Sequence, residues 1–229
     1  MTYDINQRFQ FLTQLAQMVI NRVTPSLIVT GEGGLGKTYS IMKAVSDCEL
    51  WESEYVVIKG YSTARGLYNT LFDNRDRIII FDDCDSILED RVALNILKGA
   101  LDSYETRTIS WQSRMTRGDE YPNQFNFSGG VIFISNKNMD TIDGAILSRS
   151  LTVDLSMTCD EKIQRMSHIL PEILPKYSIE SKRLALNFLD VNKSNLNLNL
   201  RSLVITTKLI AHNPDNWQDL ANYMLKVGV

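Results

Sequence analysis

Hydrophobic residues follow two patterns that alternate along the chain up to about residue 155. Short unbroken runs are typical of buried strands, and recurrence every three or four positions is typical of amphipathic helices. The runs predict strands at 26–30, 55–58, 77–81, 130–134 and 151–155. The recurrent spacing predicts helices at 5–20, 37–45, 62–72 and 87–101, with Ser62 as the cap of the third. Because strands alternate with helices, we predict a three-layer α/β domain around a parallel five-stranded sheet.

The pattern changes after about Thr158. Helix-like segments then follow one another, punctuated by prolines and without a strand of comparable strength between them. These segments are 161–170, 181–190, 199–211 and 215–226. We therefore expect a boundary near Ser156, with an α/β domain at 1–156 and a small helical domain at 157–229.

One segment interrupts the α/β pattern. Between residues 106 and 129, hydrophobic and polar residues alternate in two stretches on either side of a turn-like middle. This alternation is typical of a β-hairpin, and it lies directly before the fourth predicted strand. We expect a hairpin inserted into the α/β domain.

Composition narrows the class of protein. The chain has 229 residues, of which 44% are hydrophobic and 22% charged, and its net charge is −3. These values are typical of a soluble globular protein, and no apolar run is long enough to cross a bilayer. The first residues lack the features of a secretory signal and the three cysteines are widely spaced, so we expect a cytoplasmic protein. The charge argues against wholesale wrapping of nucleic acid but not against a narrow basic channel.

The most informative stretch lies between the first strand and the next helix, and reads Gly31-Glu32-Gly33-Gly34-Leu35-Gly36-Lys37-Thr38. Glycines at its first and sixth positions followed by Lys-Thr form the pattern of a phosphate-binding loop. Such glycines let backbone N–H groups surround an anion, and the helix N-terminus adds partial positive charge. We expect Lys37 to lie along the β- and γ-phosphates of ATP and the Thr38 hydroxyl to hold Mg²⁺. An ordinary glycine turn is the alternative, which the order strand, loop, helix disfavours.

Two carboxylates follow the apolar run of the third strand. A carboxylate at that strand end can bind the Mg²⁺ that Thr38 also holds, and we assign this role to Asp82. Asp83 points differently, and we assign it the orientation or deprotonation of the attacking water. The alternative is that both acidic residues merely begin a solvated turn.

In their order along nearly the whole chain, these motifs together with Asn136, Arg149 and Arg201 resemble the AAA+ ATPases. The resemblance implies that Asn136 is sensor 1, which helps to place the attacking water. It implies that Arg149 is the arginine finger that enters a neighbouring subunit's site, and that Arg201 is sensor 2 on a helical lid over the nucleotide. Guanidinium and amide groups offer the donors and acceptors that these contacts need. The alternatives are a helix-end cap for Arg149 and a solvated helix charge for Arg201.

One position departs from the family pattern. The family usually has Asp-Glu at the end of the third strand, where this chain has Asp82-Asp83. The shorter side chain implies slow hydrolysis or a shift of role toward Asp85, and we retain Asp83 as the catalytic candidate.

The expected hairpin holds candidates for nucleic-acid contact. AAA+ helicases and translocases that this layout resembles carry a hairpin here that projects into the pore of a ring. The resemblance implies that Arg107, Arg114 and Arg117 contact a nucleic-acid backbone and that Trp111 stacks on bases. Alternatively, the aromatic residues hold the hairpin to its own domain and the arginines are solvated.

The compact layout resembles small phage-encoded AAA+ proteins and the core modules of clamp loaders and helicase loaders. It implies a Mg²⁺-dependent ATPase that forms a homo-oligomeric ring, hexameric in our expectation, and acts on DNA or RNA in the host cytoplasm. The alternative from another class is a nucleotide-dependent loading or assembly switch that acts on a partner protein. A protein unfoldase is disfavoured, because no aromatic-hydrophobic-glycine loop follows the second strand.

Overall fold

The computed structural model of the chain describes residues 3–104, 106–112 and 121–226. These residues form two compact units. The α/β unit contains residues 9–31 and 37–155, and the helical unit contains residues 3–8, 32–36 and 156–226. The middle of the phosphate-binding loop thus groups with the helical unit, which the hydrophobic pattern does not predict.

The α/β unit is built on a parallel sheet of five strands in the order β2-β3-β6-β1-β7. The strands are β1 (Ser26–Thr30), β2 (Tyr55–Lys59), β3 (Ile78–Asp82), β6 (Gly130–Ile134) and β7 (Leu151–Asp154). Every residue of β1, β3 and β6 is buried, because these three strands lie inside the sheet with both faces covered. The predicted α/β fold with a central five-stranded parallel sheet is confirmed.

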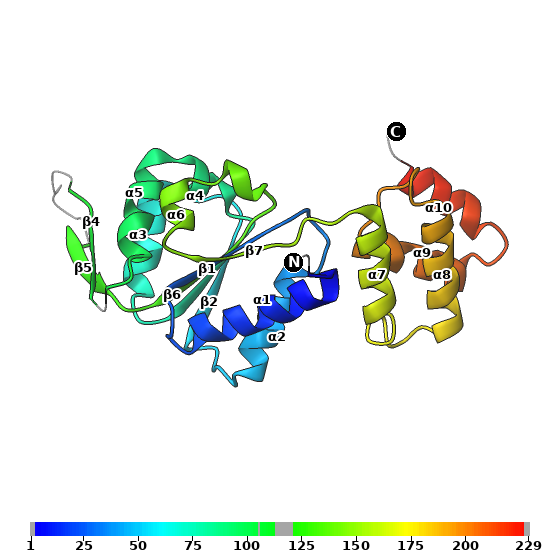
Figure 1. Ribbon diagram of the computed structural model, residues 1–229, viewed down its shortest axis with the longest axis horizontal. Helices are drawn as coiled ribbons and strands as arrows, with labels where there is room; N and C mark the ends of the chain where they lie inside the picture. Colours follow the sequence, from blue (N-terminus) through cyan, green and yellow to red (C-terminus); the bar gives the residue numbers. More distant parts are fainter. Residues whose placement is uncertain (1–2, 105, 113–120, 227–229) are drawn as a thin grey trace. The chain divides into compact units, whose positions relative to one another are not determined.

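Helices cover both faces of this sheet (Figure 1). One face carries α2 (Lys37–Asp47) and the part of α1 (Ile5–Ile20) that belongs to the α/β unit. The other carries α3 (Ala64–Asp73), α4 (Asp85–Glu89), α5 (Arg91–Ala100) and α6 (Gly144–Leu147). Because side chains alternate along a strand, Ile79 and Phe81 of β3 pack into the core beneath α3 and α5, whereas Asp82 points toward the face of α2.

Two helix boundaries differ from the sequence prediction. The cap of α3 is Thr63 rather than Ser62, because the Thr63 side chain accepts a hydrogen bond from the Gly66 N–H. The helix predicted at 87–101 is two helices, since Asp90 adopts an extended backbone and accepts hydrogen bonds from Val92 and Ala93 as the N-cap of α5.

The expected hairpin forms from β4 (Arg107–Ser110) and β5 (Gln124–Phe127), which pair antiparallel with Ile109 opposite Phe125. Its buried side chains Ile109, Phe125 and Phe127 belong to the same core cluster as α3 and α5. The hairpin therefore packs on its own domain through one apolar face.

The helical unit consists mainly of α7 (Cys159–Ile169), α8 (Ile179–Val191), α9 (Leu200–His212) and α10 (Trp217–Leu225). Thr158 begins α7 with a capping box that uses Glu161, and Asn199 caps α9 through the Ser202 N–H. Phe188 and Trp217 meet edge to face, with ring centroids 5.2 Å apart, in a separate apolar core.

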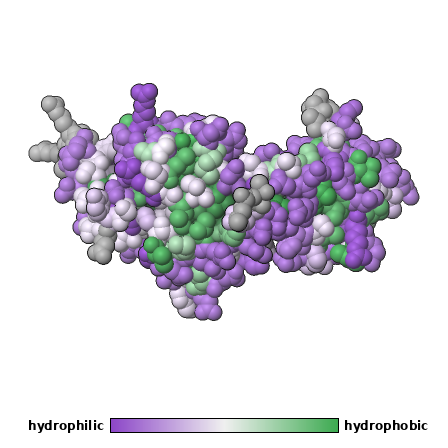
Figure 2. Space-filling view, viewed as in Figure 1, coloured by the Kyte–Doolittle hydropathy of each residue, from purple (hydrophilic) through white to green (hydrophobic). Residues whose placement is uncertain are grey.

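On the face seen in Figure 2, hydrophilic residues cover most of the helical unit and the rim of the α/β unit, and hydrophobic residues gather near the middle of the α/β unit. Across the described ranges, no helix combines the length and apolar character that crossing a membrane requires.

Candidate nucleotide site

Three neighbouring strands of the α/β unit deliver the predicted residues to one edge of the sheet. The phosphate-binding loop follows β1, Asp82 ends β3, and Asn136 lies two residues beyond β6. Since β3, β6 and β1 are adjacent and parallel, their carboxyl ends lie side by side. This edge is where open α/β sheets bind ligands.

A chain of hydrogen bonds joins Lys37, Asn136 and Asp83. The Lys37 ammonium is buried, with 5% of the residue exposed, and donates to the Gly31 carbonyl and to Asn136 Oδ1, the latter at 2.9 Å. Asn136 Nδ2 in turn donates to Asp83 Oδ1 at 2.6 Å. The Asn136 amide thus accepts a hydrogen bond from Lys37 and donates one to Asp83, so the three side chains are held next to one another.

A second set of contacts centres on Asp82. The Thr38 hydroxyl donates to Asp82 Oδ1 at 2.9 Å, and the Lys59 ammonium lies 3.1 Å from Asp82 Oδ2. The side chain of Asp82 is 7% exposed, so this carboxylate is buried between a hydroxyl and a cation. The predicted pair Thr38 and Asp82 is therefore together in the structure. Lys59 is a further residue of this site that the sequence does not predict. The sequence places Lys59 at the end of a strand, but not that strand next to β3.

Backbone geometry separates the two aspartates. Asp82 is the last residue of β3, whereas Asp83 has a φ of 58° and donates its N–H to the Ile134 carbonyl at 3.1 Å. This left-handed conformation turns the Asp83 side chain away from Asp82 and toward Asn136. Asp85, the alternative catalytic residue, instead accepts from the Ser135 hydroxyl at 2.6 Å.

The middle of the loop is held within the helical unit. The Leu200 N–H, in the first turn of α9, donates to the Gly34 carbonyl at 2.9 Å. Lys162 of α7 pairs with Glu32 at 2.6 Å, which offsets a negative charge inside a loop that binds anions. Arg201 is exposed and directly follows Leu200. It therefore lies in the same first turn of α9 that contacts the loop.

Two glycines of the loop have a left-handed backbone and little room for a side chain. Gly34 has a φ of 75°, and a Cβ there would lie 3.3 Å from Asn199 Cβ. Gly36 has a φ of 92°, and a Cβ would lie 3.2 Å from Leu200 Cδ1. Both positions therefore combine a left-handed backbone with close approach to the start of α9.

Arg149 lies at the opposite edge of the sheet from Lys37. Its carbonyl accepts from the Ser26 hydroxyl at 3.3 Å, and Ser26 is the first residue of β1, whose other end leads into the loop. The five residues of β1 separate the two edges by roughly 13 Å. Arg149 is exposed, and its guanidinium donates to the Ala145 carbonyl at 2.9 Å. It therefore does not contact the Lys37 site of its own chain.

The hairpin candidates have different environments. Arg107 is 7% exposed, and its guanidinium donates to the Ala100 and Gly129 carbonyls at 2.6 Å each, so it holds the hairpin to the domain rather than facing solvent. Trp111 is half-buried and packs against Tyr68 and the guanidinium of Arg65. Arg114 and Arg117 lie outside the described residues.

Comparison with known proteins finds a sequence relative and solved structures with the same fold. No protein-family model matches the chain. The chain is 30% identical over 238 residues to an uncharacterized 36.7 kDa protein from the nrdC-mobD intergenic region of Enterobacteria phage T4, with 95% of this chain and 73% of the phage protein covered. Two mutants of RuvB from Thermotoga maritima share its fold, with TM-scores of 0.61 and 0.58 at 11% and 10% identity. They cover 96% of this chain, which spans 68% and 67% of theirs. The chain therefore belongs to the same family as this phage T4 protein, and it has the same fold as RuvB.

Proposed function

We propose that this protein binds ATP with Mg²⁺ and hydrolyses it to ADP and phosphate. The observation that carries the proposal is the hydrogen-bonded chain from Lys37 through Asn136 to Asp83, beside the bonded pair Thr38 and Asp82. A phosphate-binding cation, a polar bridge and a carboxylate within one short chain are the groups that phosphoryl transfer to water requires.

Asp82 at the end of β3 and Thr38 in the first turn of α2 fit a magnesium ion. One carboxylate and one hydroxyl at hydrogen-bond distance, Asp82 and Thr38, are hard oxygen donors, and Mg²⁺ in phosphate sites is bound by one or two such protein ligands plus phosphate oxygens. When bound, Mg²⁺ neutralises charge on the β- and γ-phosphates. Lys59, which pairs with Asp82 at 3.1 Å in the structure, offsets the negative charge of this buried carboxylate.

Asp83 and Asn136 serve the attacking water. Asp83 Oδ1 accepts from the Asn136 amide, and its second oxygen can accept the proton of a water that lies next to the γ-phosphate. The Asn136 amide is hydrogen-bonded to both Lys37 and Asp83. The same amide therefore positions the ammonium that binds phosphate and the carboxylate that accepts the proton.

No arginine is among the site residues named above. Arg149 is the candidate that supplies an arginine to the site of another subunit. We propose that the protein forms a homo-oligomeric ring in which Arg149 enters the neighbouring site and Arg201 contacts the nucleotide from the helical lid. Phosphoryl transfer gains most of its rate from such charges.

We further propose that the ring acts on DNA or RNA in the host cytoplasm, as the resemblance to AAA+ helicases and phage proteins implies. The hairpin before β6 supports this assignment by its place in the chain, although Arg107 is buried in the domain and is not among the contact candidates. The alternative is a switch that times the loading or release of a partner protein.

Measurements of ATP hydrolysis and of ATP binding test the proposed activity and the proposed site. The wild-type chain is expected to hydrolyse ATP in a Mg²⁺-dependent reaction, and Lys37→Ala to abolish tight ATP binding because it removes the charge that faces the phosphates. Lys43→Ala is the matched control, since Lys43 is an exposed lysine on the same helix. Equal ATP affinity in Lys37→Ala and Lys43→Ala would show that the loop is not the nucleotide site.

The same assay with single-stranded DNA, double-stranded DNA and RNA separates the two candidate roles. Stimulation of turnover severalfold by a nucleic acid supports the ring that acts on nucleic acid. Stimulation only by a partner protein supports the switch.

A further inference from the structure

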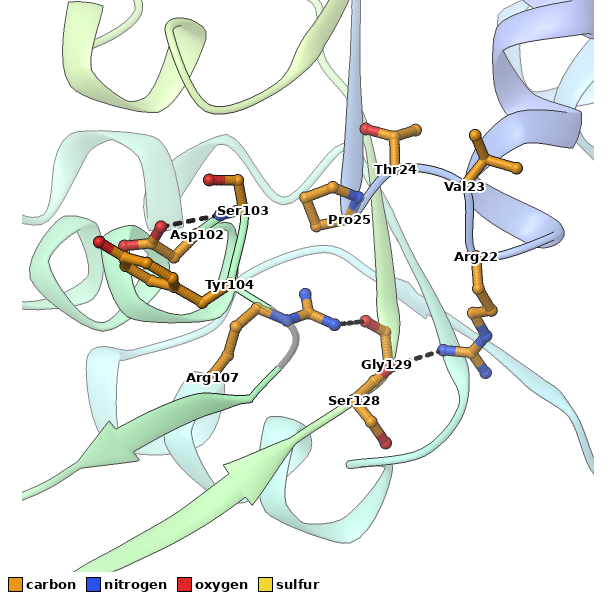
Figure 3. A pocket seen from close by; sticks show the side chains of 10 residues that line it. All are labelled: Arg22, Val23, Thr24, Pro25, Asp102, Ser103, Tyr104, Arg107, Ser128 and Gly129. Carbon is orange, nitrogen blue, oxygen red and sulfur yellow. Dashed lines mark hydrogen bonds between the residues drawn. The ribbon is translucent and has the colours of Figure 1, made fainter.

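A second polar cavity lies at the amino-terminal edge of the sheet, away from the Lys37 site. Its volume is about 380 Å³, and it is lined by the turn before β1, the segment after α5, the start of β4 and the residues before β6 (Figure 3). This volume lies in the range of small-molecule sites, which begins at about 300 Å³. All of its lining residues belong to the α/β unit.

Two arginines bracket one wall of this cavity. Arg22 donates to the Ser128 carbonyl at 2.9 Å and Arg107 donates to the Gly129 carbonyl at 2.6 Å, so the two guanidinium groups approach consecutive peptide groups from opposite sides (Figure 3). A second bond fixes each group, from Arg22 to the Asp76 carbonyl and from Arg107 to the Ala100 carbonyl. Both cations are therefore held in place by backbone atoms.

The positive charge of this pair has no direct counter-ion. Within the described ranges, neither Arg22 nor Arg107 forms a salt bridge with a carboxylate. Burial lowers the pKa of both arginines, and the charge of Arg22 lowers the pKa of Arg107 further. In the opposite direction, Asp76 and Glu54 raise the pKa of Arg22, and Asp102 raises the pKa of Arg107. Arg107 is 7% exposed, whereas Arg22 is exposed. Buried cations are normally paired, so Arg107 favours an anion in the cavity.

The remaining donors match a phosphate group. A guanidinium has five N–H donors, and the bonds to carbonyls account for two on each arginine, which leaves N–H groups on both for a ligand or for solvent. Thr24 and Ser103 add hydroxyl groups to the lining, Asp102 adds one carboxylate, and Tyr104 is 73% exposed beside them. Planar guanidinium groups bind phosphate oxygens in pairs, and an exposed aromatic ring can stack on a base.

We propose that this cavity is a second anion site, which binds a phosphate group of a nucleotide or of a nucleic-acid backbone through N–H groups of Arg22 and Arg107. The site is distinct from the phosphate-binding loop, because it lies at the amino ends of β1 and β6 whereas the loop follows the carboxyl end of β1. It does not depend on the proposed ATPase activity.

The test places a negative charge in the cavity without disturbing the arginines. Replacing either arginine removes bonds to the backbone and endangers folding, so the informative pair is Ser103→Asp and its neutral, matched control Ser103→Asn. Thr24→Asp and Thr24→Asn repeat the comparison from another part of the lining. All variants carry Lys37→Ala, which silences the phosphate-binding loop. Binding of inorganic phosphate, AMP and a short oligothymidylate is measured by calorimetry at low salt.

The proposal predicts that at least one probe binds the Lys37→Ala chain, that each Asp variant weakens this binding roughly tenfold or more, and that each Asn variant leaves it nearly unchanged. Binding of oligothymidylate without AMP or phosphate identifies a nucleic-acid backbone as the source, and binding of AMP or phosphate identifies a free ligand. No binding of any probe, or equal binding by the Asp and Asn variants, overturns the proposal.

Discussion

Asp83 joins a special backbone conformation to the chemistry assigned to it. Its φ of 58° lies in the left-handed region, which Asp and Asn adopt more readily than longer side chains do. This preference gives a physical reason for an aspartate at a position where the AAA+ ATPases, which the sequence resembles, usually have a glutamate. The short side chain still reaches Asn136, whose amide donates to Asp83 Oδ1 at 2.6 Å.

Asp83→Asn is therefore a clean test of catalysis. Asparagine tolerates the same φ, and its Oδ1 can keep the hydrogen bond from the Asn136 amide, but the amide cannot accept a proton from water. We expect ATP affinity close to wild type and turnover lowered by about 10²–10⁴-fold, measured by equilibrium titration and by phosphate release. Normal turnover in this variant would make Asp85 the better candidate for the base.

At the scale of elements, the strands were predictable and the interruptions between helices were not. Burial on both faces makes β1, β3 and β6 continuous hydrophobic runs, which are visible in the sequence. The break between α4 and α5 depends on the Asp90 side chain, which competes for backbone N–H groups inside an otherwise helical pattern. The contact of Lys59 with Asp82 depends on which strands are neighbours, and periodicity does not reveal sheet order.

The loop and α9 provide a prediction at this scale. Gly34 and Gly60 both have positive φ, at 75° and 88°, so alanine at either position costs about 1–2 kcal/mol of unfolding free energy from the backbone alone. Only at Gly34 does the new Cβ press on Asn199, the cap of α9, whereas no atom lies within 4 Å of a Cβ at Gly60. We expect Gly34→Ala to lose about 1 kcal/mol more in urea unfolding, and to be the variant of the two that binds ATP more weakly.

Gly60→Ala is the control for backbone strain in this pair. Equal ATP affinities and equal unfolding free energies in the two variants would contradict a role for the contact between the loop and the start of α9.

At the scale of the whole molecule, the proposed site is divided between chains. Lys37, Asp82, Asp83 and Asn136 gather at the carboxyl edge of the sheet, and Arg149 lies at the amino edge, beyond the length of β1. The hydrophobic pattern predicts the strand ends where Asp82 and Asp83 lie, whereas the roles of Asn136 and Arg149 were implied by the resemblance to AAA+ ATPases. The hydrogen bonds that join Lys37 to Asp83 through Asn136 required the fold, since the three residues come from three separate segments.

If the divided site is correct, a single chain is a poor enzyme and assembly completes it. Arg149→Ala is then expected to bind ATP with wild-type affinity and to hydrolyse it more slowly by a factor on the order of 10³, because the charge that develops on the transferred group is no longer met.

The most direct measurement mixes two inactive proteins, Arg149→Ala and Asp83→Asn, and follows phosphate release. In a mixed ring, some interfaces pair an intact Asp83 with an intact Arg149 from the neighbouring chain, so activity is expected to return in part, up to a maximum that depends on the mixing ratio. Exchange of subunits is verified independently with fluorescently labelled chains. Verified exchange without any recovery of activity would contradict the shared site and leave Arg149 as a helix-end residue that bonds the Ala145 carbonyl of α6.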